Sequence, residues 1–170
     1  MSNYTVLVIG KMASTNVDAY IRSAKFDVDV ENGSHVVIDS LVSGDLNVYE
    51  GSAPTDVENQ QIFIVADPVL VETEGVRIGL DDPRKFIVKA GRPACIRQLV
   101  VGDDVTISEA GFEGTPVVGQ YVVPQNGKYK LAPSATIPID VKLVYQVEAK
   151  TAIPVGQEYV TAYKIRVVKA

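Results

Sequence analysis

The sequence predicts an all-β protein, either an antiparallel sandwich or a barrel-like β domain built from hairpins. Short runs rich in valine, isoleucine, threonine and tyrosine recur along the chain, separated by glycine, proline, asparagine and aspartate, as expected where turns connect antiparallel strands. Helix-period patterns are nearly absent, so at most one short helix or an N-terminal arm is expected. The composition, 46% hydrophobic and 22% charged, is that of a globular chain.

Bulk composition narrows the classes of function. The formal net charge of −5 and the scattered basic residues argue against nucleic-acid or anionic-membrane binding, which requires clustered lysine and arginine. No apolar run is long enough for a spanning helix, and residues 1–15 lack the basic segment that would predict a cleaved signal. Cys95 is the only cysteine, which excludes an internal disulfide and a thiolate zinc site.

Residues 1–25 are expected to form an N-terminal strand followed by a short helix or an extended arm, and residues 26–170 a β domain. The apolar run near the start predicts the strand. Four residues then stand at helical spacing behind possible serine, threonine or asparagine caps: Val17, Tyr20, Ile21 and Ala24.

The β domain begins with a predicted hairpin whose turn is Asn32-Gly33, because this residue pair best tolerates the positive φ angles of a tight turn. A brief strand is expected at residues 46–49, within an irregular stretch rich in turn formers. Three further strands are predicted between breaks that contain proline and glycine: residues 60–71, 85–91 and 94–102.

The last third of the chain predicts a second hairpin and a terminal β-ribbon. Asn126-Gly127 marks the hairpin turn, and Pro124 before it indicates an edge strand or a short ladder because proline has no N–H to donate. Apolar and polar residues alternate over residues 136–149, and residues 158–169 are the expected partner strand. Residues 149–157 are expected to form a longer hairpin loop.

Three tyrosines of the terminal ribbon, Tyr145, Tyr159 and Tyr163, fall on its inward faces. We expect them to be core or interface residues with their hydroxyls at the rim. A sugar-binding platform is the alternative interpretation.

Four acids fall within residues 100–114: Asp103, Asp104, Glu109 and Glu113. The two aspartates follow Gly102 where a turn must form, and aspartate favours turns by accepting hydrogen bonds from nearby backbone N–H groups. A whole strand then separates them from Glu109, roughly 15 Å at about 3.3 Å per residue. Turns are therefore favoured over a calcium loop, which needs several oxygen ligands at short fixed spacing.

A second acidic group, Asp27, Asp29 and Glu31, alternates with apolar residues as on one face of a strand. A solvated strand face is the favoured interpretation, because any half-buried antiparallel strand shows this alternation. A weak cation site shared with another subunit is the alternative.

His35 and Cys95 are the remaining candidates for chemistry. His35 is the only histidine, and no motif of a hydrolase, zinc enzyme or phosphate loop accompanies it, so we expect an exposed polar residue near a hairpin end. Cys95 lies between apolar neighbours and is expected to be a small buried hydrophobe. The sequence therefore predicts no catalytic, cofactor-binding or metal-binding residue.

Taken in order, residues 26–55, 79–82, 100–135 and the terminal VVKA resemble small structural proteins of tailed bacteriophages, the capsid decoration or cement proteins. The resemblance covers most of the chain from Phe26 onward. It consists of a Gly-Asp turn, a TIS strand and the hairpin pattern GTPVVGQYVVPQNG.

The resemblance implies a non-enzymatic virion protein on the outer capsid surface, made in the host cytoplasm and present in many copies. Its implied partners are the major capsid protein and other copies of itself, with no nucleic acid and no membrane. The residues before Phe26 would contact the lattice or a sister subunit, or would belong to the subunit's own sheet. Two alternatives are a virion fibre or adhesin component that binds a host-surface glycan, and a hydrolase acting through His35 and nearby acids.

Overall fold

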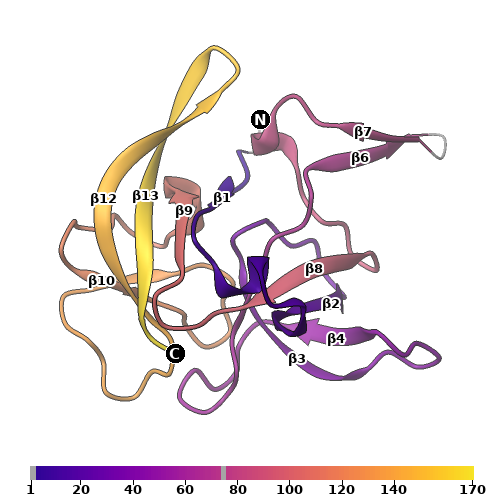
Figure 1. Ribbon diagram of the computed structural model, residues 1–170, viewed down its shortest axis with the longest axis horizontal. Helices are drawn as coiled ribbons and strands as arrows, with labels where there is room; N and C mark the ends of the chain where they lie inside the picture. The colour runs from indigo at the N-terminus through magenta and orange to yellow at the C-terminus, as the bar shows by residue number, and fades with distance from the viewer. Residues whose placement is uncertain (1–2, 74–75) are drawn as a thin grey trace.

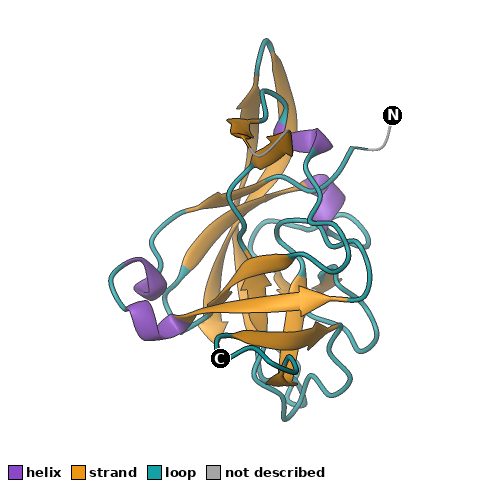
Figure 2. Ribbon diagram, turned by 90° about the vertical axis from the view of Figure 1, so that its right-hand side faces the viewer, coloured by secondary structure: helices purple, strands orange, loops and turns teal. Residues whose placement is uncertain are grey.

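The computed structural model describes residues 3–73 and 76–170, and its regular structure is almost entirely strand (Figures 1 and 2). The helical segments within these residues are single 3₁₀ turns of three residues each. No helix in the described part of the chain has the length and apolar character needed to cross a membrane. The prediction of an all-β protein is confirmed.

Six strands form one antiparallel sheet in the spatial order β1-β9-β13-β12-β10-β11. Their bounds are β1 Leu7–Ile9, β9 Asp104–Ser108, β13 Glu158–Lys169, β12 Val144–Val155, β10 Tyr121–Val123 and β11 Ala132–Ser134. β12 and β13 pair with each other over almost their whole length, whereas β9 and β10 pair with only part of them. The turn end of this long hairpin therefore projects beyond the sheet (Figure 1).

Five strands close a barrel in the order β2-β4-β3-β5-β8. Their bounds are β2 Ile21–Phe26, β4 Val48–Ser52, β3 His35–Leu41, β5 Phe63–Val65 and β8 Pro93–Gln98. All neighbouring pairs are antiparallel except β2 and β4, which are parallel. β6 Leu70–Thr73 and β7 Val76–Gly79 form a separate two-stranded hairpin that projects from the body (Figure 1).

Residues 35–37 of β3 and the whole of β5 are buried on both faces and separate two hydrophobic cores. Val36, Phe63 and Val65 point into the barrel core. Val37 and Ile64, one residue away from these, point into a second core formed against β9, β12 and β13 of the sheet. The alternation of side chains along a strand thus assigns neighbouring residues to different cores.

Of the two alternatives for residues 14–25, a short helix or an extended arm, the structure has neither in full. Two 3₁₀ turns, Ala13–Thr15 and Asp18–Tyr20, are followed directly by β2. Strand is favoured here because β2 gains backbone hydrogen bonds to two neighbours, β4 and β8, and such tertiary pairing overrides a local helical spacing. β1 pairs with β9, so the described residues before Phe26 belong to the sheet and the barrel of the same chain.

The terminal ribbon is confirmed, but the bounds of its first strand are corrected. β13 spans the predicted residues 158–169, whereas β12 starts at Val144 and continues through the expected loop to Val155. The turn is only two residues long and begins at Gly156, whose φ is +61°. Residues 136–143 form no strand; Ile139 is 89% exposed, and its carbonyl accepts a hydrogen bond from Lys169 Nζ at 2.9 Å.

Both Asn-Gly pairs form turns, and Gly33 and Gly127 have φ values of +81° and +73°. The second turn lies between the paired strands β10 and β11, as predicted. The first turn does not connect a hairpin, because β2 and β3 pair with other strands. The predicted strand at residues 85–91 is reduced to a single bridge between Val88 and Val30.

Candidate interaction surface

The acids of residues 100–114 close turns and fix neighbouring segments. Asp103 is buried, and its two carboxylate oxygens accept hydrogen bonds from the N–H groups of Val100, at 3.0 Å, and Ala13, at 2.8 Å. Asp104 begins β9 and accepts a hydrogen bond from the Lys11 N–H at 3.0 Å. The expected turn is confirmed, and β9 separates these residues from Glu109, while Glu113 pairs with Lys128.

The predicted strand face carrying Asp27, Asp29 and Glu31 is wrong, because β2 ends at Phe26. Asp29 accepts hydrogen bonds from Lys89 Nζ at 2.8 Å and from the Ala90 N–H, and the bond from Lys89 lowers the pKa of its carboxyl. Glu31 instead accepts hydrogen bonds from the N–H and the hydroxyl of Thr5. Among the described residues, no three histidine, cysteine or acidic side chains gather closely enough to hold a metal ion.

The prediction of an exposed His35 is wrong. The side chain is 0% exposed, and Nε2 lies 2.7 Å from the hydroxyl of Tyr145. The two rings meet edge to face, and Nδ1 has no hydrogen-bond partner among the described residues. Burial lowers the pKa of His35 to about 3. His35 therefore links the barrel to the sheet as a neutral imidazole that no substrate can reach.

Cys95 is only partly buried, so the expectation of a small buried hydrophobe holds in part. Its N–H donates a hydrogen bond to Asp67 Oδ1 at 3.0 Å. Burial is the largest effect on the thiol and raises its pKa. A raised pKa disfavours the nucleophilic thiolate at neutral pH.

Two of the three ribbon tyrosines are core residues, as predicted, but their hydroxyls are buried and not at the rim. Tyr145 is 0% exposed and Tyr163 is 1% exposed. Tyr159 is 77% exposed, so its predicted inward orientation is wrong. It lies opposite Pro154 near the turn of the hairpin, where the ribbon has passed the end of the sheet.

The projecting end of the β12–β13 hairpin, residues 151–155 and 158–162, is held from one side. Ile153, Val155 and Ala162 pack with Val6 of the N-terminal segment in a small separate core. The N–H of Val6 donates a hydrogen bond to Ser108 Oγ at 2.9 Å. The N-terminal segment thus packs against the projecting end and stabilises it.

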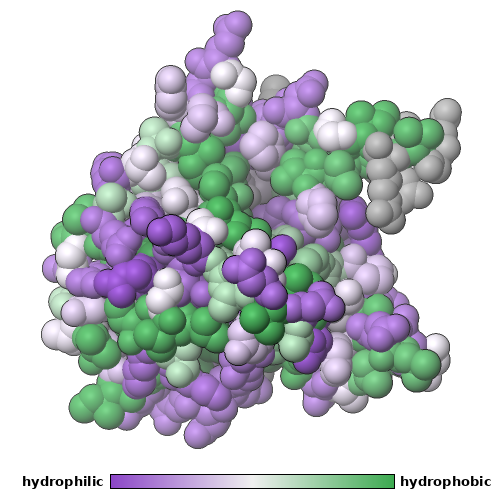
Figure 3. All heavy atoms as spheres, viewed as in Figure 1, coloured by the Kyte–Doolittle hydropathy of each residue, from purple (hydrophilic) through white to green (hydrophobic). Residues whose placement is uncertain are grey.

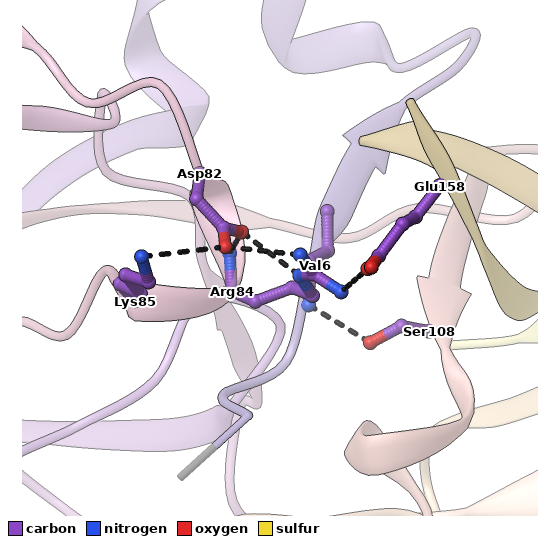
Figure 4. Close-up of polar contacts among 6 residues, drawn as sticks. All are labelled: Val6, Asp82, Arg84, Lys85, Ser108 and Glu158. Atoms are coloured by element: carbon purple, nitrogen blue, oxygen red, sulfur yellow. Dashed lines mark hydrogen bonds and ion pairs between the residues drawn. The ribbon is translucent and has the colours of Figure 1, made fainter. Parts of the chain in front are cut away.

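Arg84 connects the projecting end of the β12–β13 hairpin to the rest of the molecule (Figure 4). Its guanidinium donates to Asp82 at 2.9 Å and to Glu158 at 2.5 Å, and these two hydrogen bonds raise its pKa. Its carbonyl accepts a hydrogen bond from the Tyr4 N–H at 2.8 Å. Arg84 lies in the 3₁₀ turn Pro83–Lys85 that follows β7, so one side chain connects the base of the β6–β7 hairpin to the turn end of the β12–β13 hairpin.

The β6–β7 hairpin exposes an apolar face. Val71 and Ile78 are directly opposite each other in the register, and Val76 lies on the same face because it is two residues from Ile78. These three side chains are 39%, 54% and 59% exposed, respectively. Figure 3 shows hydrophobic residues covering this projection. Contiguous exposed apolar residues on a projecting element are typical of an interaction site.

Neither Arg84 nor the apolar face is predicted from the sequence. The alternation around Val76 and Ile78 was a signal that could have predicted β7. The role of Arg84 had no local signal, because Glu158 is 74 residues away. No family model matches the chain, and no curated protein matches it significantly.

Proposed function

We propose that this protein is a structural component of a phage virion that decorates the capsid and stabilises it by binding the major capsid subunits. The observation that carries the proposal is the apolar face of Val71, Val76 and Ile78, displayed on a hairpin that projects from the body. The resemblance of residues 26–55 and 100–135 to decoration proteins supplies the class of partner.

The rest of the molecule suits a role without catalysis. The sole imidazole is inaccessible, Asp103 closes a turn, and Asp29 and Glu113 form ion pairs. A subunit that reinforces a shell needs a stiff body and a surface that binds its neighbours. Many symmetric contacts across a lattice multiply a modest affinity per copy, so a small apolar contact on each copy is sufficient.

Cosedimentation with capsids tests this proposal. Heads of the parent phage assembled without this protein are mixed with the purified chain and pelleted, and saturable binding is expected. The double variant Val76→Asp and Ile78→Asp is expected to bind at least about tenfold more weakly, because it places charge in an apolar contact.

Leu46→Asp is the matched control for this experiment. Leu46 is 85% exposed in a loop before β4, so the same change in polarity should leave capsid binding unchanged. The absence of any cosedimentation of the wild-type chain would refute the proposed function.

A glycan-binding fibre or adhesin component is the alternative, and Tyr159 is the observation that favours it. This exposed ring lies opposite Pro154 near the tip of a projecting hairpin, and aromatic rings at such positions stack on sugars. Tyr145 and Tyr163 are buried, so they add nothing to a surface platform. A glycan array with wild type and Tyr159→Ala distinguishes the two proposals.

A further inference from the structure

A groove of about 330 Å³ lies between β6 and the segment that follows the 3₁₀ turn Pro83–Lys85. Leu70 and Val71 of β6 form one wall, and the described side chains of β7, those of Val76 and Ile78, do not line it. The opposite wall contains Phe86 and Ile87, from the extended segment that follows the 3₁₀ turn Pro83–Lys85. The groove is therefore bounded by a strand edge and by an apolar surface of the barrel.

In the described part of the chain, the edge of β6 that does not pair with β7 is open. Within the described residues β6 pairs with β7 alone, as a separate two-stranded sheet. An isolated two-stranded hairpin is at best marginally stable in water, and a third strand with apolar contacts is what such a unit lacks. An open strand edge next to an apolar groove is the arrangement used for recognition by strand addition.

In the wall formed by residues 85–89, buried and groove-lining residues alternate in a way that suits an extended ligand. Phe86 and Val88 are 3% and 0% exposed and belong to the barrel core. Lys85, Ile87 and Lys89 fall between and beside them and line the groove. An extended segment lying over this face would place apolar side chains against Ile87, with charged groups of opposite sign near the two lysines.

The charged side chains that line the groove are all cationic among the described residues, although the protein as a whole has a net charge of −5. Three cationic side chains line it, and each is anchored by one carboxylate: Lys85–Asp82 at 3.9 Å, Lys89–Asp29 at 2.8 Å and Arg92–Asp67 at 3.3 Å. The cationic side chains remain 60%, 69% and 40% exposed. They therefore keep N–H groups available for carboxylates of a partner.

We propose that this groove binds an extended segment of a partner protein, with alternating apolar and acidic residues, which adds to β6 as a third strand. The inference deepens the proposed function and rests on it for the source of the segment, which is the major capsid subunit. Backbone pairing with β6 supplies affinity, and the cationic rim selects an acidic partner.

Peptide binding followed by NMR tests the inference without capsids. The probe is an acetylated nonapeptide of alternating valine and glutamate, and the comparison peptide has lysine in place of glutamate. The acidic peptide should shift the backbone amide signals of Leu70, Val71 and Ile87 in a saturable manner. The basic peptide should bind at least about tenfold more weakly, because it meets like charges at the rim.

Two charge-reversal variants make the test specific. Lys85→Glu should weaken binding of the acidic peptide about fivefold, because it reverses one rim charge. Lys11→Glu makes the same charge change outside the groove, at an exposed residue beside β1, and should change the affinity less than twofold. Equal effects of the two variants would show that net charge alone is responsible and would overturn the proposal.

Two further outcomes would also overturn it. The first is the absence of peptide-induced shifts at β6. The second is shifts at β6 that depend on protein concentration without peptide, which would identify a second copy of the chain as the occupant. The peptide experiment contains no capsids. If the peptides do not bind but the protein cosediments with capsids, only the proposal for the groove is rejected. Failure of cosedimentation rejects the proposed function whatever the peptides do.

Discussion

His35 and Tyr145 are the polar pair at the centre of the contact between barrel and sheet. His35 comes from β3 and Tyr145 from β12, and both side chains are 0% exposed. A charged imidazole in this apolar surrounding would lose its hydration without gaining a counter-ion. The protein therefore holds His35 neutral, and its folded state resists protonation that the unfolded chain accepts.

The stability of the fold should consequently fall in acid by an amount that His35 determines. The folded pKa of about 3 lies below the ordinary value of 6.5. The stability that His35 contributes is therefore complete above pH 6.5. It is lost as the pH falls toward 3, because the imidazole of the unfolded chain binds a proton at higher pH than that of the folded chain. At pH 4.5 the loss is roughly 2–3 kcal/mol.

Urea unfolding of wild type and His35→Gln between pH 7 and pH 4.5 measures this loss. Both proteins share the same carboxylates, so the difference between their pH dependences isolates the imidazole. Wild type should lose more free energy of unfolding than the variant over this range. Identical pH dependences would mean that His35 titrates normally in the folded state.

Tyr145→Phe tests the hydrogen bond itself. The change removes the hydroxyl that contacts His35 Nε2 and leaves a buried polar nitrogen without a partner, which costs about 1–3 kcal/mol. The free energy of unfolding at pH 7 gives the magnitude. Tyr121→Phe, at a partly exposed tyrosine of β10, is the control and should have a much smaller effect.

At the scale of elements, the sequence was most informative where a strand pairs with a strand that is close to it in sequence. Residues 158–169 have the predicted bounds, since their alternation coincides with real pairing to β12. Residues 136–143 have the same alternation but no partner strand. The carbonyls of Pro138 and Ile139 accept hydrogen bonds from Lys169 Nζ and not from the backbone of a neighbouring strand. Alternation predicts which residues can form a strand, whereas pairing decides which ones do.

His35 was predicted to be exposed, and the burial of both faces of the first half of β3 explains why that prediction is wrong. Alternation normally sets a buried residue beside an exposed one, so a polar residue next to a turn is expected to face water. In the first half of β3, His35 and Val37 face away from the barrel interior and pack against the sheet instead. The neighbours of His35 along the chain contain no signal for this second covering layer, because Tyr145 is 110 residues away.

The projecting end of the β12–β13 hairpin should loosen independently when its small core is weakened. Ile153→Ala removes apolar contact with Val6 and is expected to cost about 2 kcal/mol locally. Hydrogen exchange should accelerate at the amides of residues 151–155 and 158–162, while β9 stays protected.

Thr151→Ala, on an exposed side chain of the same strand, is the control for that measurement. It should leave the exchange rates nearly unchanged. Faster exchange throughout the sheet of Ile153→Ala would show that the projecting end and the sheet open as one unit.

At the scale of the whole molecule, deletion of residues 1–25 is expected to abolish folding. It removes β1 from the sheet edge and nearly all of β2 from the barrel, which leaves β4 and β8 without the strand between them. Circular dichroism and size-exclusion chromatography measure the outcome. A folded, monodisperse truncated protein that still binds heads would contradict the role of these residues as structural strands.

β3 and β5 contribute residues to both hydrophobic cores, and this arrangement determines how the molecule unfolds. Val36 and Val37 are consecutive residues that belong to different cores, so neither core can be dismantled while the strand between them keeps its place. The barrel and the sheet therefore melt together, and calorimetry should record one transition with equal calorimetric and van't Hoff enthalpies. If the proposed capsid role is correct, a single transition would leave neither the barrel nor the sheet unfolded on its own and open to proteolysis while the protein is bound.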